Sequence, residues 1–244
     1  MRPLLALESV GKSYLRGPRE LHVLRDVSLD VHPGELVGVY GARASGKTTL
    51  LRLAAGFDAP TRGCVRFDGV DVRTLARGQL ARLHREEIGW VERAGPETRS
   101  LPMRVYVALP LYRKLGPAAA QRRALAALAK VGAEDAADAH WSSLSDTARM
   151  LVAIAHALVR EPRLLLVDDP TAGLGIVDRE RVVGLLRVAA EDERLGVLMA
   201  VPDMPAMLHA HEVRSLSRGR LLAPADPAPT GGNVVEFPGG ERSA

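Results

Sequence analysis

The sequence has a single cysteine, Cys64, among its 244 residues. One thiol excludes a disulfide within the chain and a cysteine-rich metal site, so we expect Cys64 to be a packed or incidental residue without a redox role. Long hydrophobic runs are also absent, since no stretch approaches the ~20 apolar residues of a membrane span. The apolar beginning of the chain meets Glu8 too soon for a signal peptide. These absences predict a cytosolic chain.

Lysine is scarce as well, with four lysines among the 33 basic residues. The formal net charge is only +4, and the basic residues are dispersed along the chain. A small, dispersed excess of positive charge argues against a dedicated nucleic-acid surface, so we expect no nucleic-acid partner. Hydrophobic residues make up 47% of the chain, which is enough for the core of one large domain or of a domain with an inserted subdomain.

One of the four lysines lies in a loop that fits the phosphate-binding pattern G-x-x-x-x-G-K-[ST]. The loop comprises Gly41, Ala42, Arg43, Ala44, Ser45, Gly46, Lys47, Thr48 and Thr49. Residues 36–40 before it are apolar enough for a buried strand, and residues 49–55 after it have the pattern of a helix. Backbone N–H groups and a helix N-terminus attract phosphate, so we expect the loop to bind a nucleotide. In that arrangement Lys47 reaches the terminal phosphates and the Thr48 hydroxyl ligates Mg²⁺.

Two carboxylates follow a second apolar segment. Residues 164–167 predict a buried strand, and Asp168 and Asp169 stand at its end. A phosphate-loop protein uses an Asp at such a strand end to hold Mg²⁺, so we assign that role to Asp168. The apolar run disfavours the alternative of a plain surface turn.

The remaining segments predict an α/β chain. Residues 4–10, 21–31 and 61–71 have strand patterns and form an N-terminal sheet. Further strands are expected at residues 88–91 and 196–201, and helices at residues 75–87, 117–131, 148–159 and 178–190. The Pro- and Gly-rich residues 223–244 predict a flexible tail. His209 and His211 have no third ligand in view, so we expect helix-surface residues and assign no metal.

These features, in this order, make the chain resemble the nucleotide-binding subunit of an ATP-binding cassette (ABC) transporter over residues 1–222. The resemblance rests on Tyr14, the loop of residues 41–49, Leu144 and Ser145 at a helix start, and residues 164–170. Residues 88–91 and 107–111 are similar to the subfamily of lipoprotein release, macrolide export and cell-division complexes.

The resemblance implies an α/β fold: a P-loop NTPase (RecA-like) core with an N-terminal antiparallel β subdomain and a helical subdomain inserted at about residues 94–159. It implies ATP and Mg²⁺ as cofactors, with the Tyr14 ring stacking on adenine. By itself, a loop tyrosine is more commonly an ordinary surface residue.

In the family, two subunits sandwich ATP, and the phosphate loop of one faces the Leu-Ser-Gly-Gly-Gln signature of the other. Here the signature reads Leu144, Ser145, Asp146, Thr147, Ala148. Four further positions also depart from the family. Asp169 replaces the catalytic Glu, Arg93 replaces a Gln, Gly175 replaces an Asp and Pro202 replaces the switch His.

Five departures at hydrolysis and coupling positions predict a subunit that binds MgATP but hydrolyses it weakly or not at all. A carboxylate one methylene shorter misplaces the base by about 1 Å, which costs roughly a hundredfold in rate. The first alternative is a fully active transport ATPase with Asp169 as base. A different phosphate-loop enzyme or a DNA-repair ATPase ranks below both.

The resemblance also implies partners. We expect a transmembrane permease subunit and a second nucleotide-binding subunit, with a heterodimer favoured over a homodimer, and a cytoplasmic location at the inner face of the cell membrane through the permease. In such a pair Asp146 would face the γ-phosphate of the partner's ATP. An unscreened carboxylate about 4 Å from a phosphate charge would oppose closure by about 4 kcal/mol at an effective dielectric near 20.

Overall fold

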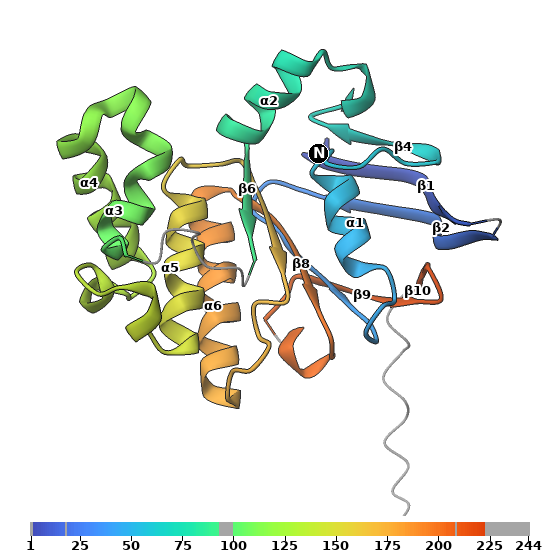
Figure 1. The fold of residues 1–244 in the computed structure, drawn as a ribbon. Coiled ribbons are helices and arrows are strands. Elements are labelled where there is room, and N and C mark those ends of the chain that lie inside the picture. The colour runs from blue at the N-terminus through green and yellow to red at the C-terminus, as the bar shows by residue number, and fades with distance from the viewer. Residues whose placement is uncertain (1, 18, 93–99, 208, 223–244) are drawn as a thin grey trace, which may run out of the picture.

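A computed structural model describes residues 2–17, 19–92, 100–207 and 209–222, which form two sheets with helices packed mainly against one of them (Figure 1). The first sheet is antiparallel, with strand order β2-β1-β4-β5. Its strands are β1 (Leu5–Arg16), β2 (Arg19–Val31), β4 (Arg62–Phe67) and β5 (Val70–Asp71). The predicted N-terminal sheet is therefore confirmed.

The first two strands are longer than the sequence pattern predicts. The β1–β2 register shifts between Leu7 and Val10, and Ser9 and Asp26 have φ values of 48° and 54° beside this point. A bulge of this kind interrupts the alternation of buried and exposed side chains, because one extra residue changes which face the chain presents. The pattern therefore ends near residue 10 although pairing continues to Arg16.

The second sheet carries the functional region, in the order β10-β9-β3-β8-β7-β6. All neighbours are parallel except the β9–β10 hairpin. Its strands are β3 (Leu36–Tyr40), β6 (Ile88–Val91), β7 (Leu164–Asp168), β8 (Gly196–Val201), β9 (Glu212–Ser217) and β10 (Arg220–Leu222). Tyr40 pairs with Val201 and Asp168 pairs with Ala200, so β3, β7 and β8 end at the same edge. Loops leaving this edge converge.

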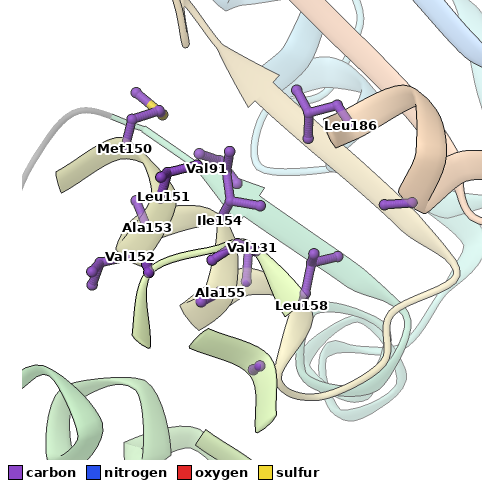
Figure 2. Close-up of a cluster of buried hydrophobic side chains, with 14 of the residues drawn as sticks. Val91, Val131, Met150, Leu151, Val152, Ala153, Ile154, Ala155, Leu158 and Leu186 are labelled. Carbon is purple, nitrogen blue, oxygen red and sulfur yellow. The ribbon is translucent and has the colours of Figure 1, made fainter. Parts of the chain in front are cut away.

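Helices cover both faces of the parallel sheet. Helix α1 (Lys47–Ala54) and the antiparallel sheet pack on one face in a cluster that includes Leu50, Leu51 and Leu53. The other face carries α5 (Asp146–Leu158) and α6 (Ile176–Glu193), whose Leu151, Ile154 and Leu186 belong to one buried hydrophobic cluster (Figure 2). Central strands covered on both sides are apolar throughout, as in the fully buried β8.

The helical region outside α5 consists of α3 (Met103–Ala108) and α4 (Tyr112–Lys130), and α2 (Arg77–Glu86) precedes β6. Within α4, Gly116 has φ 72° and ψ 167°, which breaks the helix just before Pro117. Proline suits the first turn of a helix, so the predicted helix of residues 117–131 matches the segment after the break. The short 3-10 turns are η1 (Val72–Thr74), η2 (Leu109–Leu111), η3 (Glu134–Ala136), η4 (Trp141–Ser143) and η5 (Pro205–Met207).

Two histidines differ from expectation. His209 and His211 do not lie on a helix, because they follow the short turn η5 and lead into β9. The Nδ1 atom of His211 accepts a hydrogen bond from the backbone N–H of Leu36 at 2.9 Å, and its Nε2 lies 3.1 Å from Glu191. The prediction of helix-surface residues is therefore wrong for this pair, and His211 joins β3, β9 and α6.

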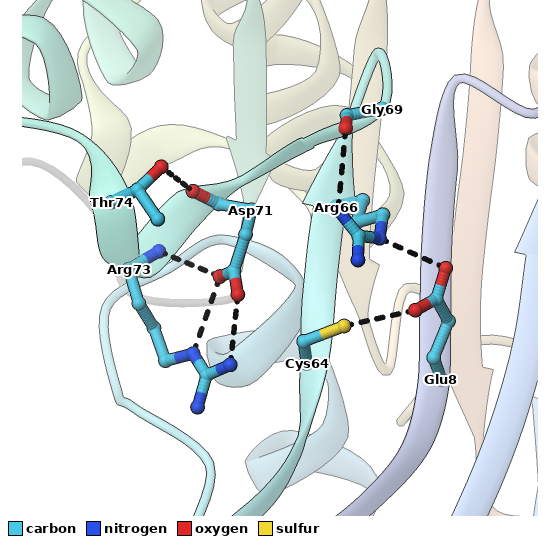
Figure 3. Close-up of polar contacts among 7 residues, drawn as sticks. All are labelled: Glu8, Cys64, Arg66, Gly69, Asp71, Arg73 and Thr74. Carbon is cyan, nitrogen blue, oxygen red and sulfur yellow. Dashed lines mark hydrogen bonds and ion pairs between the residues drawn. The ribbon is translucent and has the colours of Figure 1, made fainter.

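Cys64 lies in a polar network on the antiparallel sheet (Figure 3). Its thiol donates to the Glu8 carboxylate at 3.0 Å, and Arg66 donates to the same carboxylate at 3.0 Å. The hydrogen bond to Glu8 raises the pKa of the Cys64 thiol. A raised pKa keeps the sulfur protonated and poorly nucleophilic, which supports the expectation of no redox role.

Within the described ranges, none of the helices has both the length and the apolar character needed to cross a membrane.

Candidate nucleotide-binding site

The loop after β3 has a conformation that requires glycine at two positions. Gly46, the N-cap of α1, has φ 107°, in the left-handed region that other residues rarely adopt. A Cβ on Gly41 would lie 2.4 Å from the Leu216 carbonyl oxygen. The two fixed glycines of the sequence pattern therefore have separate structural reasons, one conformational and one steric.

Lys47 turns back over this loop. Its Nζ atom donates to the carbonyl oxygens of Gly41 at 2.6 Å and Ala42 at 3.0 Å. Burial lowers the pKa of Lys47, while the nearby Asp169 and Asp168 carboxylates act in the opposite direction. The structure thus places an ammonium group at the mouth of the loop, between the α1 N-terminus and two carboxylates.

Thr48 and Asp168 are brought into direct contact from positions 120 residues apart. The Thr48 hydroxyl donates to Asp168 Oδ2 at 2.8 Å. Asp168 is the last residue of β7, and the next residue, Asp169, has φ 51° and donates its N–H to the Ala200 carbonyl at 2.8 Å. A hydroxyl and a carboxylate that meet beside a phosphate-binding loop match the oxygen ligands that Mg²⁺ prefers.

The residues present fit a nucleotide phosphate and its Mg²⁺. The loop offers backbone N–H groups at a helix N-terminus, an ammonium group and a hydroxyl–carboxylate pair, and these supply positive potential and oxygen ligands together. Residues Ala42, Arg43 and Ala44 are exposed, so the loop is open to a ligand. Ser45 and Thr49 are partly buried on either side of Gly46 and Lys47.

Tyr14 lies apart from the loop contacts just described. It is 39% exposed, and its hydroxyl donates to Asp58 Oδ2 at 3.4 Å. The Lys12 ammonium stands over the ring, 4.9 Å from the centroid, which is a cation–π geometry. Arg52 of α1 holds Asp58 at 2.8 Å, so this cluster is anchored to the helix that begins with Lys47. Stacking on adenine stays a prediction for Tyr14.

The signature segment begins α5. Ser145 is the N-cap, and its hydroxyl accepts a hydrogen bond from the Ala148 N–H at 3.1 Å. The predicted helix start, with a small polar cap, is confirmed. Leu144 and Thr147 are partly buried, whereas Asp146 is exposed in the first turn. In the described part of the chain, no hydrogen bond or ion pair joins residues 144–148 to residues 41–49.

The Asp146 carboxylate is paired with a cation, so the limiting case of an unscreened charge that was considered from the sequence does not apply. Arg149 donates to Asp146 Oδ1 at 3.2 Å, three residues further along the same helix. The estimate of about 4 kcal/mol for an unscreened charge is therefore an upper bound. Arg149 was not among the residues expected at this site, although opposite charges at i and i+3 on a helix are a recognisable signal.

Three further positions at which the sequence departs from the family are Gly175, Pro202 and Arg93. Gly175 is the N-cap of α6 with an extended backbone, and a Cβ there would meet no atom within 4 Å. The local space would thus admit a larger residue. Pro202 directly follows β8 and lines a groove of about 930 Å³ together with residues 41–45 and part of β2. Arg93 lies outside the described residues.

A phosphate-loop α/β domain with a hydroxyl–carboxylate pair at the end of its sheet is the class defined by this fold and site. A family model described as ABC transporter matches residues 24–172. The chain is 34% identical over 219 residues to the lipoprotein-releasing system ATP-binding protein LolD of Chromohalobacter salexigens, covering 89% of this chain and 92% of that protein.

The chain is also 35% identical over 236 residues to the macrolide export ATP-binding/permease protein MacB 1/2 of Paracoccus denitrificans. That match covers 93% of this chain and 35% of the relative, so the chain spans about a third of the length of this MacB. The dimeric structure of MJ0796, a bacterial ABC transporter cassette, aligns with a TM-score of 0.81 and 28% identity over 89% of this chain and 96% of that one.

The chain therefore belongs to the ABC transporter family, and its relatives include the ATP-binding protein LolD. The expected fold and the expected subfamily are confirmed.

Proposed function

We propose that this subunit binds MgATP through residues 41–49 and Asp168, docks on a transmembrane permease and hydrolyses ATP weakly or not at all. The cassette would span residues 1–222, with the helical subdomain at about residues 94–159 and a flexible tail at residues 223–244. Its role in the complex would then be structural or regulatory.

The contact between Thr48 and Asp168 carries the binding part of this proposal. The hydroxyl and the carboxylate meet at 2.8 Å beside an ammonium group that is held in the loop, and this arrangement supports binding of phosphate and Mg²⁺. A bound Mg²⁺ would supply charge neutralisation on the phosphate oxygens. A relative in the family, MJ0796, has been solved with ADP and Pi.

The proposal of weak hydrolysis depends on the side chains near the phosphate loop and Asp168. Asp169 follows Asp168 in a left-handed backbone conformation, and its carboxylate is the weak candidate base. Pro202 lines the groove beside the loop but has no side-chain donor and cannot carry a proton. A base one methylene shorter, without a proton carrier opposite it, supports weak turnover.

The partners are inferred from the relatives. LolD is named as a subunit of a lipoprotein-releasing system, and MacB is named as an ATP-binding and permease protein. We therefore expect a transmembrane permease subunit and a second nucleotide-binding subunit, with a heterodimer favoured because this signature departs from the family. The subunit would lie in the cytoplasm, held at the membrane by the permease.

A second function has one observation in its favour. The Asp169 carboxylate lies close enough to Lys47 to counteract the effect of burial on the pKa of the lysine, so a carboxylate is present next to the candidate phosphate site. A fully active transport ATPase with Asp169 as base would use this group.

Equilibrium binding of a fluorescent ATP analogue, with and without Mg²⁺, tests the proposed binding. We expect saturable binding that strengthens with Mg²⁺. Absence of binding by the folded chain would refute the proposed function.

A further inference from the structure

Arg149 contacts the chain in three directions around the start of α5. Its Nη1 donates to Asp146 Oδ1 at 3.2 Å, its Nε to the Trp141 carbonyl at 3.1 Å and its Nη2 to the Ser142 carbonyl at 3.3 Å. All three guanidinium nitrogens are thus engaged. A lysine could not reproduce this arrangement, because its three N–H groups radiate from one atom.

The two carbonyl contacts hold the Arg149 guanidinium against the turn η4, whose first residue is buried. Trp141 is 8% exposed and begins η4, which leads directly into the N-cap Ser145. Because Arg149 is held by this turn, the carboxylate that it binds is held at the side of the first helical turn. Asp146 itself is exposed, and within the described part of the chain its carboxylate makes no other side-chain hydrogen bond.

The side chains around Arg149 carry an excess of negative charge. A pocket of about 130 Å³ beside it is lined by Glu92, Trp141, Asp146, Arg149, Met150 and Ala153. Among these lining residues Arg149 is the one cation, and it stands with two carboxylates. Without it, the Asp146 side chain could turn toward the helix end, where unpaired backbone N–H groups attract a carboxylate.

We propose that Arg149 is a positioning residue that restrains the Asp146 carboxylate at the side of α5 and so leaves the helix end at Ser145 open to the phosphate of a nucleotide held by a second subunit. This inference rests on the proposed function, because it assumes that the signature segment meets nucleotide on a second subunit. A restrained and paired carboxylate makes the departure from glycine at position 146 compatible with closure of the two subunits.

The test is a double-mutant cycle on the full chain, with a second copy of the chain as the probe. Each copy carries both a phosphate loop and a signature segment, so a second copy stands in for the nucleotide-binding partner, which we expect to be a different chain in the complex. Self-association is measured by sedimentation with a non-hydrolysable ATP analogue and Mg²⁺ for the wild type, Arg149→Gln, Asp146→Asn and the double variant. Binding of the analogue is measured on each variant first, so that association is compared at equal occupancy.

We expect Arg149→Gln to weaken the association constant at least about fivefold when Asp146 is charged, and less than about twofold on the Asp146→Asn background. Arg149→Lys should behave like Arg149→Gln, because it keeps the charge but loses the contacts with Trp141 and Ser142. Arg149→Gln loses the contacts with Trp141 and Ser142 on both backgrounds. A general loosening of the turn would therefore weaken association equally on both backgrounds and would not contribute to the difference between them.

An equal loss on both backgrounds, no loss at all, or wild-type behaviour of Arg149→Lys would overturn the inference. If the chain binds the analogue but neither the wild type nor Asp146→Asn self-associates, the inference also fails while ATP binding stands. Failure of the wild type to bind the analogue would instead refute the proposed function.

Discussion

The hydroxyl of Thr48 donates a hydrogen bond to the Oδ2 atom of Asp168 at 2.8 Å, which joins the first turn of α1 to the end of β7. Both side chains offer an oxygen ligand to a cation, and the Lys47 ammonium lies in the same loop. The contact defines where a divalent cation and a phosphate would be held together.

Asp168→Asn should remove most of the Mg²⁺ dependence of nucleotide binding. An amide keeps the hydrogen bond to Thr48 but lacks the negative charge that favours a cation, so we expect the enhancement of affinity by Mg²⁺ to fall by roughly tenfold. Titration of a fluorescent ATP analogue with and without Mg²⁺ measures this enhancement of affinity. Asp192→Asn, at an exposed position on α6, is the matched control. An unchanged Mg²⁺ effect in Asp168→Asn would exclude this residue as a ligand.

Lys47→Ala should abolish measurable binding of the same analogue. Loss of charge-assisted hydrogen bonds to the phosphates costs about 3 kcal/mol, or roughly a hundredfold in affinity. Lys130→Ala, at the far end of α4, removes another of the four lysines and should bind normally. Normal affinity in Lys47→Ala would contradict the assignment of the phosphate loop.

Tyr14→Ala tests the predicted adenine contact. If the ring stacks on the base, affinity for ATP should fall about tenfold while affinity for tripolyphosphate, which has no base, should not change. Tyr14→Phe keeps the ring but loses the hydroxyl contact with Asp58, and it should bind ATP like the wild type. Equal losses for ATP and tripolyphosphate would show that Tyr14 acts on the fold and not on the base.

His156 should make stability depend on pH. Its ring stacks on Tyr106 with centroids 4.3 Å apart and bonds the Tyr106 carbonyl at 3.1 Å, and burial lowers its pKa from 6.5 to about 4. As pH falls, His156 therefore takes up its proton at a higher pH in the unfolded chain than in the folded chain. Stability from this group is complete above pH 6.5 and is lost as pH falls through 4, by roughly 3 kcal/mol in total.

Urea unfolding at pH 7 and pH 4.5 measures this effect as a difference between proteins. The loss of stability on acidification should be smaller in His156→Gln than in the wild type, whereas His140→Gln, at an exposed position, should behave like the wild type. Identical pH dependence in all three proteins would show that His156 is not buried in its neutral form.

The fold and the phosphate loop could be predicted from the sequence because their signals are local. The apolar residues 36–40 and 164–167, the glycine spacing and the polar cap at Ser145 each report on a few neighbouring residues. The Mg²⁺ roles of Thr48 and Asp168 were predicted separately, from the loop pattern and from a carboxylate at a strand end, and the structure adds that the two side chains are in contact.

Other features depend on contacts between distant residues and could not be predicted. His211 accepts a hydrogen bond from Leu36, 175 residues away, and no local pattern encodes that pairing. The bulge near Ser9 conceals the true length of β1, because it breaks the alternation that marks a strand. The screening of Asp146 by Arg149 is local, but position 149 lies just outside the family motif of residues 144–148.

The central claim, that ATP is bound but hydrolysed weakly, is tested most directly by phosphate release from the purified chain at saturating ATP and Mg²⁺. We predict a rate near background, and no recovery in Asp169→Glu alone, because Arg93 and Pro202 remain. The combined Asp169→Glu, Pro202→His and Arg93→Gln change should raise the rate at least about tenfold, since it restores a base and a proton carrier together. Robust phosphate release by the unmodified chain, lost in Lys47→Ala, would contradict the account.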